Sequence, residues 1–279
     1  HGIDRPEVLV LENSFHGRTL ATLTATGNRK AQAGFEPLVQ GFVRVPYNDL
    51  DAVETAAANR PAISAMLVEP IQGEGGIVVP DDGYLAGLRA LCDSHGWLLM
   101  LDEIQTGMGR TGTMFAYQHT GILPDVMTLA KGLANGVPIG ACLARGAAAE
   151  VFGPGSHGST FGGNPLACRS GSAVLDVLIS ERLSERAAIL GHRMLEGLRD
   201  ALDGTDGIVE IRGRGLMLGI ELEQPCSELV SHALDEGMLI NVTAGRVVRL
   251  LPPLIIDDQQ ADCIVDAVSR LIRAFLAAA

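Results

Sequence analysis

The sequence contains no apolar run of about 18 residues, the length needed to span a bilayer. It is also poor in positive charge, with 21 lysines and arginines against 33 aspartates and glutamates, and a formal net charge of −12. Nucleic acids and anionic membranes both require a cationic surface, so this charge argues against either as a partner. An anionic substrate would then have to be bound by individual arginines.

Cysteine is scarce and irregularly placed. The five cysteines are odd in number, widely spaced and include no C-x-x-C pair. This pattern is not typical of a disulfide framework or a zinc site, so we expect no metal and a reduced, cytoplasmic compartment. The amino end has no apolar secretory segment. The sequence starts at His1 and enters an apolar run within a few residues, so we expect it to begin inside a domain.

Apolar residues make up 47% of the sequence and aromatic residues only 4%, a balance that suits helices layered on a sheet. Along most of the chain, short apolar runs typical of buried strands alternate with stretches at helical spacing. This alternation predicts an α/β fold with a mostly parallel sheet flanked by helices. The expected strands are 8–11, 63–68, 97–101, 126–129 and 139–143, and the expected helices are 50–58, 84–94, 165–179 and 182–202.

The pattern changes near residue 180, where short strands and terminal helices replace the regular alternation. This change predicts a second, smaller α+β domain. We therefore expect a large domain over residues 1–180 and a small C-terminal domain over residues 181–279. The strands expected in the small domain are 209–211, 216–222, 239–242 and 247–250, followed by a helix over 258–277.

The apolar run 97–101 ends in Asp102 and Glu103, as a buried strand does when its carboxyl end opens into a site. Lys131 follows a second apolar run, so a carboxylate and a lysine could face one ligand. An apolar strand ending in Asp-Glu is also typical of the Mg²⁺-binding strand of P-loop ATPases, but the required G-x-x-x-x-G-K-[ST] loop is absent from the sequence. An ordinary buried strand with a capping aspartate is the remaining alternative.

Five motifs place this pair in a larger pattern. They are NSFHGRT (13–19), EPIQGEGG (69–76), LDEIQTGMGRTG (101–112), TLAKG (128–132) and GSTFGGNP (158–165). In order and spacing they resemble the class III, or ω-amino acid, aminotransferases, and within that family the members that act on N-acetylornithine. The resemblance runs from about residue 8 to the carboxyl end.

The resemblance implies a homodimer of pyridoxal-phosphate fold type I. Lys131 matches the lysine that holds the cofactor as a Schiff base, and we expect it to be buried because burial favours the uncharged amine. Asp102 matches the carboxylate that keeps the pyridine nitrogen protonated. The other implied cofactor contacts are Phe15 and Ile104 on the two ring faces, Gln105 at the 3′ oxygen, Glu103 beside Asp102 and, from the other subunit, Thr160 at the phosphate.

The resemblance also implies substrate contacts. Arg18 matches an arginine that binds a substrate carboxylate, and Arg249 matches a second carboxylate arginine from the small domain. Glu69 and Glu74 resemble glutamates beside the site, one of which can neutralise Arg249 when no second carboxylate is present. The sequence does not distinguish between them. Ser159 is the remaining residue implied near the substrate. His16 and His157 lie in or directly beside motifs, where we expect positioning rather than acid–base chemistry.

The implied reaction moves the terminal amino group of N-acetylornithine to 2-oxoglutarate, giving N-acetylglutamate semialdehyde and glutamate in arginine biosynthesis. Ornithine, succinyl-diaminopimelate and 4-aminobutyrate are alternative donors. The family's main phosphate-binding loop lies upstream of the Phe15 motif and has no counterpart in this sequence. We therefore expect the large, cofactor-binding domain to be incomplete at its amino end. A catalytically incomplete chain that keeps only a dimer or interaction surface is the alternative from another functional class.

Overall fold

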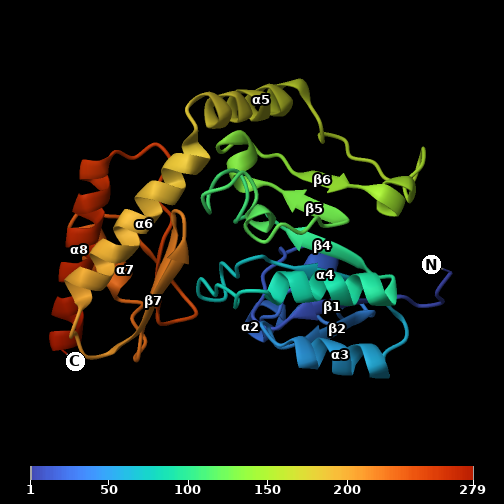
Figure 1. The fold of residues 1–279 in the computed structure, drawn as a ribbon, viewed down its shortest axis with the longest axis horizontal. Coiled ribbons are helices and arrows are strands. Elements are labelled where there is room, and N and C mark those ends of the chain that lie inside the picture. Colours follow the sequence, from blue (N-terminus) through green and yellow to red (C-terminus); the bar gives the residue numbers. More distant parts are fainter. Residues whose placement is uncertain (1, 279) are drawn as a thin grey trace. The chain divides into compact units, whose positions relative to one another are not determined.

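The computed structural model describes residues 2–278, which form two compact units (Figure 1). Unit 1 contains the chain up to Gly73, then Pro80–Gly107 and Phe115–Val177. Unit 2 contains Glu74–Val79, Met108–Met114 and the chain from Leu178 onward. The main division lies close to the expected boundary at residue 180, but a single boundary does not describe the chain. Two short segments from the first half of the sequence fold with unit 2.

Unit 1 is built on a six-stranded sheet in the order β2-β1-β3-β4-β5-β6. All neighbouring pairs are parallel except β5 and β6, which are antiparallel. The predicted α/β fold with a mostly parallel sheet is confirmed. The antiparallel edge strand follows a link with no crossover helix, and a parallel strand would need a longer connection. The strands are β1 Glu7–Leu11, β2 Phe42–Val45, β3 Ile63–Val68, β4 Leu98–Asp102, β5 Val126–Leu129 and β6 Ala141–Ala144.

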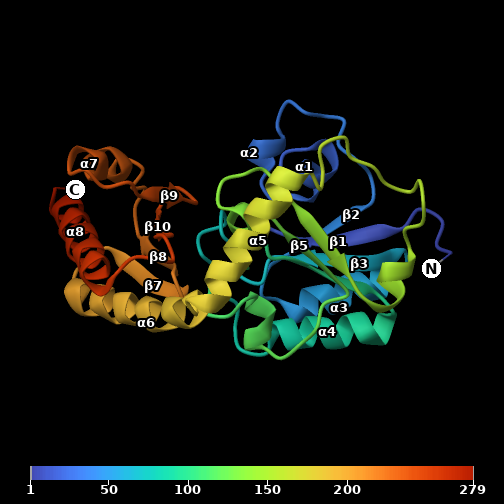
Figure 2. The ribbon, with the colours of Figure 1, turned by 90° about the horizontal axis from the view of Figure 1, so that it is seen from above.

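Helices cover both sides of this sheet. In Figure 2, α3 and α4 lie together on one side and α1 and α2 on the other. The α4 side chains at three- and four-residue spacing, Leu85, Leu88 and Cys92, are buried in one core with the strands. The helices of unit 1 are α1 Leu20–Ala25, α2 Arg29–Gln32, α3 Leu50–Asn59, α4 Tyr84–His95 and α5 Pro165–Ser180, whose last residues belong to unit 2, with 3₁₀ helices η1 Ala116–His119, η2 Lys131–Ala134 and η3 Gly146–Glu150.

Unit 2 contains an antiparallel four-stranded sheet in the order β7-β8-β10-β9. Its core combines the inner faces of α6 and α8 with side chains from β8 and β10. Helix α8 begins at a capping box in which Asp257 and Gln260 each bind the other's backbone N–H. The elements are α6 Leu183–Leu202, β7 Ile208–Arg214, β8 Met217–Leu222, α7 Leu229–Asp235, β9 Asn241–Thr243, β10 Val247–Leu250 and α8 Asp258–Ala277.

The short elements β2, α1, α2 and α7 were not expected from the sequence. Strand β2 has only four residues, and Arg44 interrupts its apolar pattern. The Arg44 guanidinium donates instead to the carbonyls of Thr24 and Thr26 at the end of α1. Such elements depend on contacts made elsewhere in the chain, so periodicity alone does not predict them. Between residues 2 and 278 no helix combines the length and apolar character needed to cross a membrane.

Candidate active site

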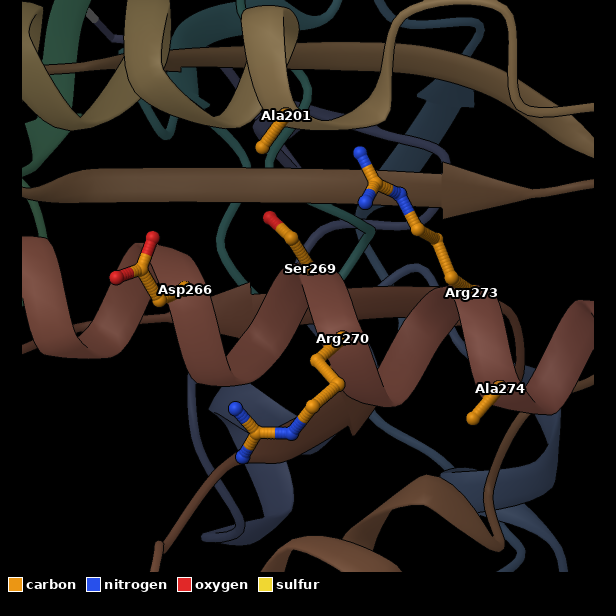
Figure 3. Close-up of a pocket in the computed structure, with 6 residues that line it drawn as sticks. All are labelled: Ala201, Asp266, Ser269, Arg270, Arg273 and Ala274. Carbon is orange, nitrogen blue, oxygen red and sulfur yellow. The ribbon is translucent and has the colours of Figure 1, made fainter.

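Unit 2 has a surface pocket of about 470 Å³ (Figure 3), but the residues that line it do not form a candidate active site. None of the motif residues lines it. Its two arginines, Arg270 and Arg273, extend in different directions from α8 and do not converge on one anion (Figure 3). Arg270 is also paired with Glu236. The candidate site therefore lies with the motifs.

Four neighbouring strands of unit 1 end at one edge of the sheet. Strands β1, β3, β4 and β5 are adjacent and parallel, so their carboxyl ends lie at the same edge. Asp102 is the last residue of β4, and the segments that follow β1, β3 and β5 carry Phe15, Glu69 and Lys131 in turn. Open α/β sheets bind ligands at this edge. The fold thus brings four of the predicted residues to one place.

Glu69 holds the loop that carries Phe15. Its Oε2 accepts the Phe15 N–H at 2.9 Å and its Oε1 accepts the Gly73 N–H at 3.3 Å. Burial raises the pKa of Glu69 to about 7, although the charge of His16 and the two N–H donors oppose the rise. Both oxygens are already bound to backbone within unit 1. Glu69 therefore positions the loops that carry Phe15 and Gly73, and its contact with the substrate stays a prediction.

The backbone after Glu69 has a second anchor that the sequence did not reveal. The Tyr47 hydroxyl donates to the carbonyls of Glu69 and Pro70 at 3.1 and 3.0 Å. Burial raises the pKa of Tyr47 well above its ordinary value, so the hydroxyl stays protonated and remains a donor. The only sequence signal was an aromatic residue just beyond a short strand, which is too common to indicate this role.

Asp102 is the last residue of β4 and is buried. Its Oδ2 lies 2.8 Å from His16 Nδ1, and its Oδ1 accepts the Ile104 N–H at 3.1 Å. The register between β4 and β5 places Asp102 opposite Thr128. The Asp102 carboxylate is thus held by His16 in the loop after β1 and by the Ile104 N–H, and its backbone is held by the sheet. The Asp102–His16 contact spans 86 residues of sequence, so no local pattern predicts it.

Glu103 connects the loop after β4 to η1. Its Oε2 accepts the Thr106 hydroxyl and the Ala116 N–H, and its Oε1 accepts the Tyr117 N–H at 2.9 Å. Burial raises the pKa of Glu103, and these hydrogen bonds oppose the rise. These hydrogen bonds show that Glu103 shapes the loop beside Asp102, and its contact with the cofactor stays a prediction.

Gln105 lies directly over the backbone of Gly73. A Cβ atom at Gly73 would be 2.1 Å from Gln105 Oε1, so any other residue at this position would displace the Gln105 amide. The contact joins the loop after β3 to the loop after β4. Gln105 and the neighbouring Ile104 are half-buried, so both keep one accessible side at the edge.

Lys131 begins η2, directly after the turn that ends β5. The expectation that it is buried is wrong, because the residue is exposed in this chain. Strand β5 ends at Leu129, so Lys131 lies beyond the buried residues of the strand. Its φ of 42° lies in the left-handed region, which is uncommon for a residue with a side chain and often marks a functional position.

The remaining predicted residues of unit 1 are exposed. Arg18 lies with its Cζ 5.6 Å from the centre of the Phe15 ring, a cation–π distance that keeps the guanidinium near this loop. Ser159 and Thr160 lie in the segment before α5. The Ser159 Oγ accepts the Gly162 N–H at 2.9 Å, which fixes the turn. Within residues 2–278, neither hydroxyl is hydrogen-bonded to the residues at the strand ends.

In unit 2, Arg249 pairs with Glu74. Arg249 Nη1 lies 2.7 Å from Glu74 Oε1, and the arginine side chain is 10% exposed while the glutamate is 41% exposed. The Thr243 hydroxyl donates to the Glu74 carbonyl and holds its backbone. Glu74, and not Glu69, is therefore the glutamate that pairs with Arg249. The sequence left this choice open because the two glutamates are only five residues apart.

The groups at the strand ends of unit 1 fit pyridoxal phosphate. Each Asp102 oxygen has one hydrogen bond, so the carboxylate can accept another from a protonated ring nitrogen. Phe15 offers an aromatic face, and Lys131 offers an accessible amine for an aldehyde. A carboxylate, an aromatic ring and an amine on three neighbouring loops match the nitrogen, the face and the carbonyl of this cofactor.

Comparison with known proteins agrees with this geometry. The family described as aminotransferase class-III matches residues 1–272. The acetylornithine aminotransferase of Nitrosomonas europaea is 58% identical over 275 residues, covering 99% of this chain and 70% of that protein. The ornithine aminotransferase of Toxoplasma gondii superposes with a TM-score of 0.93 at 39% identity, covering 98% of this chain and 66% of that one.

A second structure of the Toxoplasma gondii ornithine aminotransferase, crystallised with oxidised glutathione, also has a TM-score of 0.93 and 39% identity, over 97% of this chain and 65% of that one. It shows partial occupancy of pyridoxal phosphate at that protein's active site. The present chain spans about two thirds of the length of these solved structures.

The raised pKa of Glu69 predicts a specific dependence of stability on pH. The folded chain holds the Glu69 proton up to about pH 7, whereas the unfolded chain releases it near 4.5. Its contribution is fully present below about pH 4.5 and is lost as pH rises toward 7. Relative to Glu69→Gln, the wild-type free energy of unfolding should therefore fall by about 3 kcal/mol across this window.

Denaturant unfolding at several pH values measures this difference. The glutamine side chain has the size of glutamate, but its amide N–H₂ would face one of the two backbone N–H donors. The variant should therefore be less stable than wild type at pH 4.5, and the two stabilities should approach each other near pH 7. Exposed Glu54 on α3 gives the control substitution Glu54→Gln, which should leave the slope unchanged. Parallel curves for wild type and Glu69→Gln would contradict the prediction.

Proposed function

Because the chain belongs to the class-III aminotransferase family, we propose that it moves the terminal amino group of N-acetylornithine to 2-oxoglutarate. The products are N-acetylglutamate semialdehyde and glutamate, and the reaction is a step of arginine biosynthesis. The observation that carries the proposal is the set of four adjacent strand ends, which bring an aromatic ring, two carboxylates and a lysine together. The 58% identity to an acetylornithine aminotransferase supports the choice of substrate.

Pyridoxal phosphate, when bound, supplies an aldehyde for the substrate amine and withdraws electrons from the reacting carbon. Asp102 keeps the ring nitrogen protonated, since its carboxylate is held in place by His16 and Ile104. Phe15 would pack on one ring face and Ile104 on the other, and Gln105 would bind the 3′ oxygen. The Lys131 Nζ would hold the aldehyde, and the same amine would be the base that moves the proton at the reacting carbon.

Two arginines serve the substrate carboxylates in this proposal. Arg18 binds the α-carboxylate of N-acetylornithine with its bidentate guanidinium, beside the Phe15 ring. Arg249 binds the second carboxylate of 2-oxoglutarate and pairs with Glu74 when the substrate lacks one. The observed 2.7 Å Arg249–Glu74 contact supports this exchange, and the partial exposure of Glu74 lets the pair open.

We further propose that the chain works as a homodimer in which Thr160 reaches the cofactor phosphate of the other subunit and Ser159 lies near its substrate. The segment around them exposes large apolar side chains, of which Phe161 is 81% and Phe152 is 71% exposed. Exposed apolar side chains gathered on one segment are typical of a protein interface. Ser159 and Thr160 are exposed in the same segment.

We also propose that the protein is located in the cytoplasm. This location is supported by the cysteine pattern, and within the described chain all five cysteines are free thiols.

Other amino donors of the family remain a second possibility. Ornithine is favoured among them by the 39% identity to an ornithine aminotransferase. Succinyl-diaminopimelate and 4-aminobutyrate are the other donors that the motifs allow. These donors differ in whether they carry an α-carboxylate and a free α-amine, so comparing them tests the role of Arg18.

The first prediction concerns Lys131. The full-length protein purified with pyridoxal phosphate should absorb in the visible range, and borohydride should attach the cofactor to the peptide that contains Lys131. Lys131→Ala should lose both signals and lower kcat by at least about 10²-fold, because it removes the amine that moves the proton. The control Lys30→Ala, at an exposed lysine of α2, should keep them. A wild-type protein without the visible band would contradict the proposed function.

The second prediction concerns the amino donor. In single-turnover half-reactions, N-acetylornithine should react faster than ornithine or 4-aminobutyrate. Arg18→Ala should lower kcat/KM for N-acetylornithine by about 10- to 100-fold, because it removes a charged hydrogen bond to the carboxylate. It should change kcat/KM for 4-aminobutyrate, whose only carboxylate is not an α-carboxylate, much less. Equal losses for both donors would show that Arg18 does not read the α-carboxylate.

The third prediction concerns the interface. Phe161→Asp should lower the mass in solution, measured by light scattering, from that of two chains toward that of one, because it buries a charge at the contact. The affinity for the cofactor should also fall, because Thr160 of one subunit would no longer reach the cofactor phosphate of the other. Leu239→Asp, at a similarly exposed apolar residue of unit 2, is the matched control and should leave the mass unchanged. An unchanged mass for Phe161→Asp would place the interface elsewhere.

A further inference from the structure

The segment between β1 and α1 carries Phe15 and Arg18, and it is hydrogen-bonded to the residues that follow α1. The Asn13 N–H donates to the Gly27 carbonyl at 3.3 Å, and the Gly27 N–H donates to the Ser14 carbonyl at 2.9 Å. The two stretches run so close together that a Cβ atom at Gly27 would be 2.4 Å from the Asn13 nitrogen. The end of α1 therefore supports this segment.

Thr26, at the end of α1, contacts the two residues directly before Arg18. Its Oγ1 accepts the His16 N–H at 3.0 Å, and its hydroxyl proton faces the carbonyls of Thr22 and Gly17, at 3.0 and 3.4 Å. Thr26 is completely buried. Between residues 2 and 278, no other side chain is hydrogen-bonded to the backbone of Gly17 or Arg18.

Phe15 and His16 are held by other residues as well. Glu69 Oε2 accepts the Phe15 N–H at 2.9 Å, and His16 Nδ1 lies 2.8 Å from Asp102 Oδ2. Loss of the Thr26 hydroxyl would leave these two contacts in place. The Phe15 ring and the Asp102 carboxylate should therefore keep their positions for the cofactor.

Arg18 depends on Thr26 from both sides along the chain. Before it, the Gly17 carbonyl lies against the Thr26 hydroxyl. After it comes α1, whose last turn is closed by the Thr26 N–H, which donates to the Thr22 carbonyl at 2.9 Å. The Arg18 side chain is exposed, and its cation–π contact with Phe15 is weak at an exposed site. The guanidinium thus takes its position from the backbone that Thr26 fixes.

Thr26 is itself held by two side chains from elements further along the chain. Its carbonyl accepts Gln32 Nε2 at 2.8 Å and Arg44 Nη2 at 3.1 Å. Gln32 is the last residue of α2 and is buried, and Arg44 lies on β2. The final carbonyls of a helix have no partner within the helix, and these two donors satisfy one of them. Thr26 is therefore fixed independently of the loop that it holds.

We propose that Thr26 is a positioning residue that sets the place of Arg18, and through it the preference for amino donors with an α-carboxylate. The proposal rests on the function proposed above, in which Arg18 binds that carboxylate. A bidentate contact between guanidinium and carboxylate requires a fixed direction as well as a charge, so a displaced Arg18 binds this group less well. Thr26 acts without touching the substrate or the cofactor.

Two substitutions separate the hydroxyl from packing. Thr26→Val keeps the shape of the side chain and removes the hydroxyl, whereas Thr26→Ser keeps the hydroxyl and removes a methyl group. In the full-length enzyme, Thr26→Val should lower kcat/KM for N-acetylornithine by about 10-fold, mainly through KM, because a charged hydrogen bond to a non-reacting group is weakened. It should change the kcat/KM for 4-aminobutyrate and the dissociation constant of pyridoxal phosphate little. Thr26→Ser should stay close to wild type in all these measurements.

A double-substitution cycle tests whether Thr26 acts through Arg18. Adding Thr26→Val to Arg18→Ala should lower kcat/KM for N-acetylornithine little further, because the contact is already lost. Losses that multiply would overturn the proposal. Equal losses for N-acetylornithine and 4-aminobutyrate in Thr26→Val would also overturn it, since a variant that is only less stable affects both donors alike.

A second variant serves if Thr26→Val does not fold. Gln32→Met has a side chain of similar length without a donor, so the Thr26 carbonyl loses one of its two partners. The ratio of kcat/KM for N-acetylornithine to that for 4-aminobutyrate should fall in Gln32→Met. Gln259→Met, at an exposed glutamine of α8, is the matched control and should leave the ratio unchanged. An unchanged ratio in Gln32→Met would overturn the proposal.

Amide hydrogen exchange in the apoprotein tests the support without measuring activity. In Thr26→Val the His16 amide should lose its protection, while the Phe15 amide, bound to Glu69, should keep the wild-type rate. Loss of protection at both amides, or at neither, would overturn the proposal. A wild-type protein that binds no pyridoxal phosphate would instead overturn the proposed function, while the exchange rates would still report on the support from Thr26.

Discussion

Three carboxylates are buried at one edge of the sheet in unit 1, and the loops there depend on how each is satisfied. A buried carboxylate without donors is too costly to keep its charge. Asp102 obtains its donors from His16 and Ile104, Glu103 from η1 and Thr106, and Glu69 from the loops after β1 and β3. Each carboxylate thus ties a loop to a neighbour, and these ties fix the positions of Phe15 and Gln105.

The roles of Glu69 and Glu103 in the fold follow from the same constraint. Both lie next to the expected site in sequence, and the resemblance implied a ligand contact for each. In the fold Glu69 accepts two backbone N–H groups, and Glu103 accepts two backbone N–H groups and the Thr106 hydroxyl. Both glutamates therefore shape the loops beside Asp102. Residue type and spacing do not reveal these pairings, and the ligand contacts stay predictions.

Unit 2 uses arginines where unit 1 uses carboxylates. Arg212 donates to the carbonyls of Gly76 and Ile77, and Arg110 donates to those of Leu216 and Pro252. Desolvation by burial lowers the pKa of Arg110 to about 10, so it remains charged near neutrality. These contacts hold residues 74–79 and 108–114 in unit 2. Glu74 therefore meets Arg249 although Gly73, directly before it in the sequence, belongs to unit 1.

The sequence alone determined the strands β1, β3, β4 and β5 and the residues that follow them, because apolar runs and parallel order follow from local pattern. Only the tertiary structure decided the direction of β6, the exposure of Lys131, the choice of Glu74 over Glu69 and the contact of His16 with Asp102. The last two depend on which donor meets which acceptor across 175 and 86 residues of sequence. Periodicity carries no information about such pairings, since a hydrogen bond requires distance and direction that only the packed chain defines.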